Sequence, residues 1–149
     1  MFTICQQKHA ELDCPEEENI FKARAVLGGH DVRDQFGCKA EFEQVAISPA
    51  AMEASRVCDT YALRPGFDCQ IGDAEKAFLQ VLAEGTPNSP TTTTTWLRLP
   101  KWLQPESWKN LVDPVVRMEK NLYGHPNAQD HWWHYLNEGL IASGWQPVG

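Results

Sequence analysis

Glycine and proline divide this chain of 149 residues into short segments, and this punctuation limits it to short helices and strands. Residues 21–27 alternate enough to predict a strand, which Gly28 and Gly29 stop. A proline at the first position predicts a helix over residues 126–143, which Gly144 caps. The alternation of helices and short strands along the chain indicates an α/β or an α+β domain.

The middle of the chain is predicted to hold a helix, a short strand, a helical turn and a loop. The helix starts at residues 48–49, where a serine N-cap precedes a proline, and residues 64–66 end it. A strand is expected over residues 67–72 and a helical turn over residues 73–83. Residues 84–95 are predicted to be a loop, whose final run of five threonines favours partial pairing as an edge strand. Further short elements are expected at residues 42–47, 96–100, 105–106 and 115–122.

Length and composition fit one packed domain preceded by a polar segment. A hydrophobic content of 42% and six tryptophans support a core, and a domain of this size buries about two-thirds of its surface on folding. Residues 1–20 are polar and acidic, so we expect them to form a lead-in to a domain over residues 21–149. The net charge of −7 is unfavourable for a chain that grips a phosphate backbone by itself.

Several classes of protein do not fit this sequence. No apolar run approaches the roughly 20 residues that span a bilayer, and the N-terminus lacks a basic segment followed by an apolar one. Five cysteines without close pairing favour reduced thiols over a disulfide framework. We therefore expect an intracellular protein, cytoplasmic or nuclear, without membrane association.

One carboxylate stands where metal-dependent nucleotidyl transferases present a metal ligand. Asp73 follows residues 69–72 and precedes Ala77, Phe78 and Leu79 in the predicted helical turn. Nucleotide addition uses two Mg²⁺ ions that clamp the attacking and leaving oxygens, and Mg²⁺ prefers carboxylate and phosphate oxygens. The simpler interpretation of the local sequence is that Asp73 caps the helix and that Phe78 packs in the core.

Two further motifs lie on either side of this segment. Lys22 and Arg24 lie on the first predicted strand, and the planar guanidinium of arginine binds phosphate oxygens in pairs. Taken alone, such a Lys-x-Arg pair is usually a solvated strand edge. Residues 121–124 read Asn-Leu-Tyr-Gly, and the glycine after Tyr123, Gly124, permits a close approach of the backbone.

Together the three motifs resemble the reverse transcriptase domain of copia-type retrotransposons. In that family the segments read Lys-Ala-Arg-x-Val, Asp-x-x-x-Ala-Phe-Leu and Ser-Leu-Tyr-Gly, which residues 22–26, 73–79 and 122–124 match in register. The resemblance covers residues 21–148 and implies an α+β fold comprising the fingers and the first part of the palm. It also implies that the Tyr-x-Asp-Asp hairpin, which shares the metals with the first aspartate, lies beyond Gly149.

The resemblance implies a role for each matching side chain in RNA-directed DNA synthesis. Asp73 is expected to be the catalytic residue that binds Mg²⁺, while Arg24 and Lys22 contact the triphosphate of the incoming dNTP. Phe78 is expected under the sugar, where its bulk excludes a 2′-hydroxyl. An RNA template, a DNA primer and the rest of a polyprotein are the implied partners, and the isolated chain is expected to be inactive. The resemblance also implies that Tyr123 and Gly124 lie on the side of the site that faces the nucleotide and the template.

The segment after Gly124 departs from the family, which continues Leu-Lys-Gln-Ala-Pro-Arg. Here residues 125–127 read His-Pro-Asn and residues 129–130 read Gln-Asp, so two cations are lost and a carboxylate is gained. This loss of positive charge weakens contact with a template. The alternative hypothesis is therefore a non-catalytic remnant, or a domesticated module that binds nucleic acid or a protein partner.

Two metal-binding hypotheses rest on histidines and cysteines. His125, His131 and His134 lack a Glu or Cys that would complete a site, so we interpret them as core or surface residues. A third functional hypothesis is a zinc or thiol site. It would consist of Cys38, Cys58, Cys69 and His30.

Overall fold

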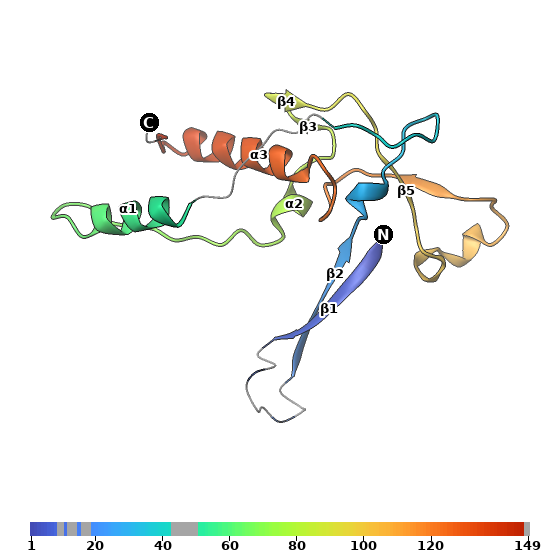
Figure 1. The fold of residues 1–149 in the computed structure, drawn as a ribbon, viewed down its shortest axis with the longest axis horizontal. Coiled ribbons are helices and arrows are strands. Elements are labelled where there is room, and N and C mark those ends of the chain that lie inside the picture. The colour runs from blue at the N-terminus through green and yellow to red at the C-terminus, as the bar shows by residue number, and fades with distance from the viewer. Residues whose placement is uncertain (9–10, 12–14, 16–18, 43–50, 148–149) are drawn as a thin grey trace.

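The structure is a computed structural model that describes residues 1–147, except residues 9–10, 12–14, 16–18 and 43–50. The described part combines three short antiparallel strand pairs with helices (Figure 1). No described helix has the length and apolar composition that crossing a bilayer requires. In chain order, the strands and α-helices are β1 (Phe2–Lys8), β2 (Ile20–Val26), α1 (Met52–Ala62), α2 (Ala77–Gln80), β3 (Gly85–Thr86), β4 (Ser89–Pro90), β5 (Trp96–Arg98), β6 (Val115–Arg117) and α3 (Ala128–Ala142).

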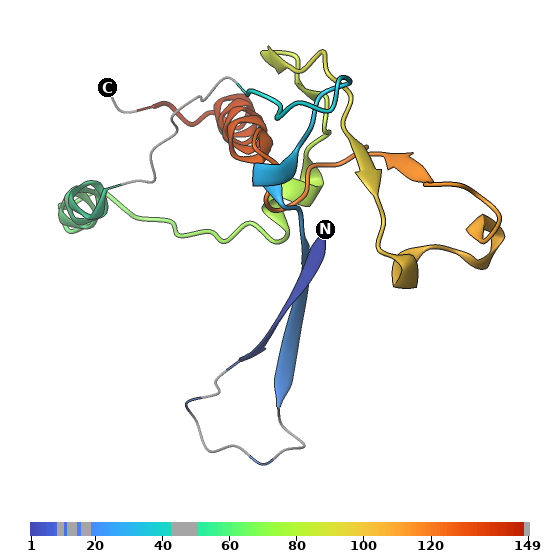
Figure 2. The ribbon, with the colours of Figure 1, turned by 45° about the vertical axis from the view of Figure 1, so that its right-hand side comes forward.

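The first strand pair is a hairpin that projects away from the rest of the molecule (Figure 2). β1 runs antiparallel to β2, and the register places Gln6 opposite Lys22 and Ile4 opposite Arg24. The expectation of a polar lead-in is therefore wrong over residues 2–8. Every residue of β1 is exposed, so this strand lacks the apolar and polar alternation by which a half-buried strand is recognised.

Elements with a local start or stop signal form as predicted. β2 ends at Val26, just before the two glycines, and α1 and β5 are a helix and a strand as expected. At the end of α3, Gly144 adopts a φ of 91° and Trp145 N donates to Leu140 O at 3.0 Å, as in a glycine C-cap. The elements expected near residues 105–106 and 115–122 are a 3-10 helix over Glu106–Trp108 and β6.

Other elements differ from the prediction. Residues 67–72 are not a strand, because no described segment pairs with them and an unpaired strand leaves its backbone groups to water. The helical turn predicted over residues 73–83 is reduced to α2, which begins after Lys76 at a φ of 51°. The predicted loop over residues 84–95 contains β3 and β4, while the run of five threonines at residues 91–95 forms no strand. The helix start at residues 48–49 and most of the strand at residues 42–47 lie outside the described residues.

The core is small, and half of its members are polar. It lies where the segments around Val81 and Asn121 run side by side, since Asn121 N donates to Val81 O at 2.9 Å and Ala83 N to Glu119 O at 2.9 Å. α3 packs against α2 and against the β3–β4 pair. The apolar buried side chains are Val81, Ala83, Met118 and Ala128, and the polar ones are Thr86, Asn121, His125 and His131.

Candidate functional site

Two of the three motifs meet at the inner end of the hairpin. Val26 and Tyr123 form a parallel bridge, and Leu27 N donates a hydrogen bond to Tyr123 O at 2.8 Å. These backbone contacts fix β2, which carries Lys22 and Arg24, beside the segment that carries Tyr123. A contact between residues so far apart in sequence depends on the tertiary fold.

The ring of Tyr123 also contacts the third motif. The ring centroids of Phe78 and Tyr123 are 5.0 Å apart in an edge-on arrangement, which aromatic pairs favour. The guanidinium carbon of Arg24 lies 5.5 Å from the centroid of the Tyr123 ring, within the range of a cation–π interaction. Tyr123 therefore joins Arg24 and Phe78, one residue from each of the other motifs.

The glycine of the third motif has a role within the protein. Gly124 adopts a φ of +84°, and a Cβ at this position would lie 2.1 Å from Leu27 O. A Cβ at Gly29 would similarly lie 2.1 Å from Gly124 O. The close approach that Gly124 permits in this structure is to the protein backbone, at Leu27 O, whereas the predicted approach to nucleotide or template stays a prediction.

A hollow of about 230 Å³ lies against the Tyr123 side of the hairpin. Lys22, Arg24 and Tyr123, three of the predicted residues, line it, and Phe78 contacts Tyr123 from outside this lining. Sequence reasoning missed Gln6, which also lines the hollow, because it depended on recognising β1 and its register. The complete lining is Ile4, Gln6, Lys22, Arg24, Val26 and Tyr123.

Positive charge gathers on this face of the hairpin. The Lys8 cation lowers the pKa of Lys22, with a smaller contribution from Arg24, whereas Asp73 raises it. Among the described residues, no carboxylate forms an ion pair with Lys8, Lys22 or Arg24. Three neighbouring cations that form no ion pair with any described carboxylate are a favourable environment for an anionic ligand.

Asp73 differs most from its expected setting. It lies exposed in an irregular segment, so the prediction that it ends a strand is wrong. The alternative of a helix cap is also wrong, because the N-cap of α2 is Lys76 and no side chain caps it. Asp73 is nevertheless close enough to Lys22 to raise its pKa, so all three motifs come together on one side of the molecule.

The described residues do not form a complete metal site. No three His, Cys, Asp or Glu side chains among them lie close enough together to hold a metal ion. The zinc site of the third hypothesis, at Cys38, Cys58, Cys69 and His30, is therefore not formed among the described residues. Asp73 supplies one carboxylate, whereas a two-metal centre needs more, so we derive no step through Mg²⁺.

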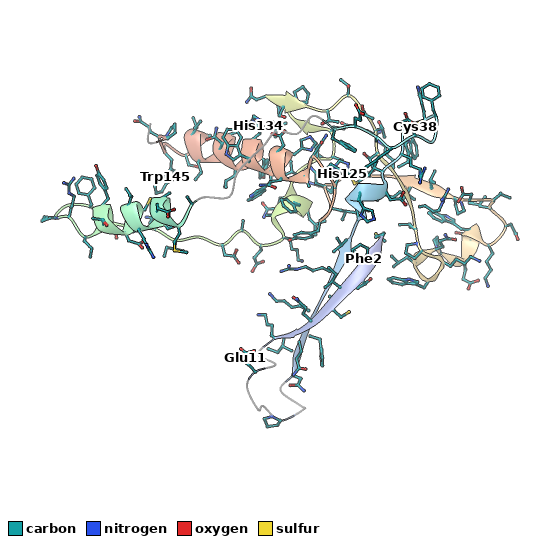
Figure 3. All side chains as sticks on the ribbon, in the orientation of Figure 1. Phe2, Glu11, Cys38, His125, His134 and Trp145 are labelled. Carbon is teal, nitrogen blue, oxygen red and sulfur yellow. The ribbon has the colours of Figure 1, made fainter. Side chains whose placement is uncertain are left out.

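A buried polar network includes Asn121 and His125, which flank Tyr123 in the sequence. Asn121 Nδ2 donates to Leu82 O at 2.9 Å and lies 3.1 Å from His131 Nδ1. His125 is buried near the middle of the molecule, whereas His134 lies further along α3 (Figure 3). The prediction that His125 and His131 are core residues is confirmed. Their threonine partners lie 30 residues away for His125 and 40 residues away for His131, and sequence reasoning missed them.

Comparison of the chain with protein-family models, with curated proteins and with solved structures gave no match.

Proposed function

We propose that residues 21–149 are the fingers and the first part of the palm of a copia-type RNA-directed DNA polymerase. In this proposal the hollow beside Tyr123 receives the triphosphate end of an incoming dNTP. The observation that carries it is the meeting of Arg24 and Phe78 at the Tyr123 ring. The sequence resemblance implies that these three residues surround one nucleotide, and their contacts in the fold support the proposal.

The chemistry of the hollow suits this ligand. Arg24 offers paired N–H donors and Lys22 a point charge, both of which bind phosphate oxygens. The Phe78 ring, held edge-on by Tyr123, would pack against the sugar and exclude a 2′-hydroxyl. Mg²⁺ would neutralise the triphosphate in the complete enzyme, with Asp73 as one of its ligands.

The alternative is a non-catalytic module that binds nucleic acid or a protein. The net charge of −7 and the loss of two cations after Gly124 favour it. Salt-sensitive RNA binding without dNTP binding would support this alternative. In contrast, binding of dNTP through Arg24 would support the polymerase proposal.

The direct test is calorimetric titration of the chain with dTTP and Mg²⁺. We expect Arg24→Ala to weaken dTTP binding by about tenfold or more, because a charge-assisted hydrogen bond to phosphate is lost. Arg98→Ala is the matched control, since Arg98 is also an exposed strand arginine but pairs with Asp113 at 2.6 Å. Equal losses in the two variants, or no dTTP binding by the wild type, would refute the proposed site.

Phe78 tests the sugar contact separately. We expect Phe78→Val to reduce the preference for dATP over ATP by roughly tenfold, because the smaller side chain leaves room for the 2′-hydroxyl. Phe36→Val is the control, since Phe36 is 80% exposed and lies outside the hollow. An unchanged preference in Phe78→Val would show that Phe78 serves only to pack against Tyr123.

Primer extension gives an independent check. The chain alone is expected to extend no primer on an RNA template, because Asp73 cannot hold two metal ions by itself. Synthesis that depends on Asp73 would contradict this expectation. It would also show that the described residues contain more of the catalytic centre than one carboxylate.

A further inference from the structure

The run of five threonines is held at both ends by buried histidines. His131 Nε2 lies 2.7 Å from Thr91 Oγ1, and His125 Nε2 lies 3.1 Å from Thr95 Oγ1. Both imidazoles are almost fully buried, with exposed fractions of 1% for His131 and 6% for His125. Buried imidazoles with specific partners on both ring nitrogens are sensitive to a change in protonation.

The partners of His131 require it to be neutral. The Leu82 carbonyl only accepts hydrogen bonds, so the Asn121 side-chain atom facing it at 2.9 Å is the amide nitrogen Nδ2. The same Nδ2 faces His131 Nδ1 at 3.1 Å, so Nδ1 must accept. Nε2 then carries the only ring proton and donates to Thr91 Oγ1. A second proton on Nδ1 would point at the Asn121 NH₂ group and break this arrangement.

The same reasoning applies to His125. Its Nδ1 accepts a hydrogen bond from Asn127 N at 3.3 Å, so the proton lies on Nε2 and is donated to Thr95 Oγ1. Protonation of Nδ1 would place two N–H groups against each other. In the neutral form, both histidines are therefore hydrogen-bonded through both ring nitrogens. Each loses its Nδ1 bond when it takes up a proton.

Two residues of this network flank Tyr123, the residue at the centre of the candidate site. Asn121 and His125 lie on either side of Tyr123, only two residues away from it in each direction. Asn121 is fully buried and is also held by its backbone, through Asn121 N to Val81 O. The position of Tyr123 thus depends on the network formed by these side chains and His131.

We propose that His125, His131 and Asn121 are positioning residues that hold Tyr123 in the candidate nucleotide site only while both imidazoles are neutral. This inference rests on the proposed function of that site. Acidification would break the Nδ1 bonds on either side of Tyr123, that of His131 to Asn121 and that of His125 to Asn127 N, while both Nε2–H bonds to the threonines remain. Arg24 and Phe78 would then lose their common contact.

The charged surroundings of the two imidazoles support this assignment. Burial lowers the pKa of His131. Two charged or titratable groups of its own helix also act on this pKa: Asp130 raises it and His134 lowers it. The packed elements α2, β3 and β4 present no charged side chain, and Glu138 of α3 is engaged by Thr86 and Asn88. Burial lowers the pKa of His125 to about 4, with a smaller contribution from His131. Both imidazoles are thus neutral at neutral pH.

Fluorine NMR of chain labelled with fluorotyrosine would follow Tyr123 without requiring a nucleotide. We expect the Tyr123 resonance to shift as the pH falls from 6.5 towards about 4, before the resonances of Tyr61 and Tyr135 change. The decisive variant is His125→Gln with His131→Gln, because a glutamine amide can both accept and donate in place of a neutral imidazole. It should keep the neutral-pH position of Tyr123 and lose the pH-dependent shift.

A matched control is His134→Gln, which removes a titratable imidazole of α3 that is not hydrogen-bonded to His125, His131 or Asn121. It should keep the Tyr123 shift, with only a small change of its midpoint because His134 lowers the pKa of His131. A wild-type Tyr123 resonance that does not move, or that moves only together with those of Tyr61 and Tyr135, would overturn the inference. A shift retained in the double glutamine variant would overturn it too. His131→Phe should displace the Tyr123 resonance at all pH values, because both bonds are lost while the ring is kept.

Binding of dTTP separates this inference from the proposed function. If dTTP binds and its affinity has the same pH profile in the wild type and in the double glutamine variant, the positioning role fails and the nucleotide site stands. If dTTP does not bind but the Tyr123 resonance titrates through the histidines, the network is real and the proposed nucleotide function fails. Protonation of the triphosphate itself is common to both proteins and cancels in the comparison.

Discussion

Gly124 and Gly37 have similar backbone angles and very different surroundings. Gly124 has a φ of +84° and no room for a Cβ, which would meet Leu27 O at 2.1 Å. Gly37 has a φ of +81°, and nothing lies within 4 Å of a Cβ built there. The pair therefore separates the cost of a left-handed backbone from the cost of a close approach between two chain segments.

We predict that Gly124→Ala destabilises the protein much more than Gly37→Ala. The shared backbone strain costs about 1–2 kcal/mol, while the clash at Gly124 should raise the total beyond about 3 kcal/mol by separating β2 from Tyr123. Urea unfolding of the two variants measures the difference. Equal midpoints would mean that the junction between Leu27 and Gly124 can open without cost.

His125 makes stability depend on pH. Its pKa falls from 6.5 to about 4 on folding, so the unfolded chain binds more protons between these values. The stabilisation is complete above pH 6.5 and is lost as the pH falls to about 4. The corresponding loss in the free energy of unfolding is about 3 kcal/mol.

The measurement is urea unfolding over this pH range for the wild type and for His125→Gln, because carboxylates also titrate there. The variant should show a smaller slope of unfolding free energy against pH. Identical slopes would mean that His125 is as accessible to protons in the folded state as in the unfolded state.

At the level of elements, β1 and residues 67–72 show opposite errors of sequence interpretation. β1 has a polar sequence, FTICQQK, and forms a strand because β2 offers seven paired positions. Residues 67–72 include Phe67 and Ile71 but find no partner among the described segments. Strand formation depends on a pairing partner, which local composition does not reveal. Helices with caps, such as α3 with Gly144, were predictable because their signals are local.

α1 packs against no other described helix or strand. Its 11 residues are all exposed or half-exposed. An isolated helix of this length is marginal in water. We predict that amides of Met52–Ala62 exchange with solvent almost unprotected, while those of Ala128–Ala142 exchange more slowly. Hydrogen exchange by mass spectrometry measures both, and equal protection would mean that another surface covers α1.

At the level of the whole molecule, apolar side chains remain exposed far from the core. Ile71 is 96% exposed, Leu63 87% and Trp102 68%. Exposed apolar surface of this kind marks a contact with another surface or a tendency to associate. The proposed function provides such a surface in the rest of the polymerase.

We therefore predict that the chain binds the dye ANS at neutral pH and self-associates at high concentration. The enhancement of ANS fluorescence and the sedimentation behaviour are the measurements. A monodisperse monomer that does not enhance the dye would show that these side chains are covered in solution.

The candidate site was only partly predictable. Lys22, Arg24, Phe78 and Tyr123 could be selected from their motifs, and the structure brings them together. Gln6 could not be selected, because it joins the hollow through the register of a strand that the sequence does not reveal. The histidine network could not be predicted either, because Thr91 and Thr95 belong to it only through hydrogen bonds to His131 and His125, which lie on a distant segment.

Because the threonine run is anchored at Thr91 and Thr95, its middle is free to change in length. Thr92, Thr93 and Thr94 are exposed and belong to no strand. Lengthening a loop between fixed ends costs little, about 0.6 kcal/mol for each doubling. Gain or loss of one threonine codon in this repeat would therefore pass almost unnoticed by selection. The same three residues are the place to insert an epitope tag without disturbing the site.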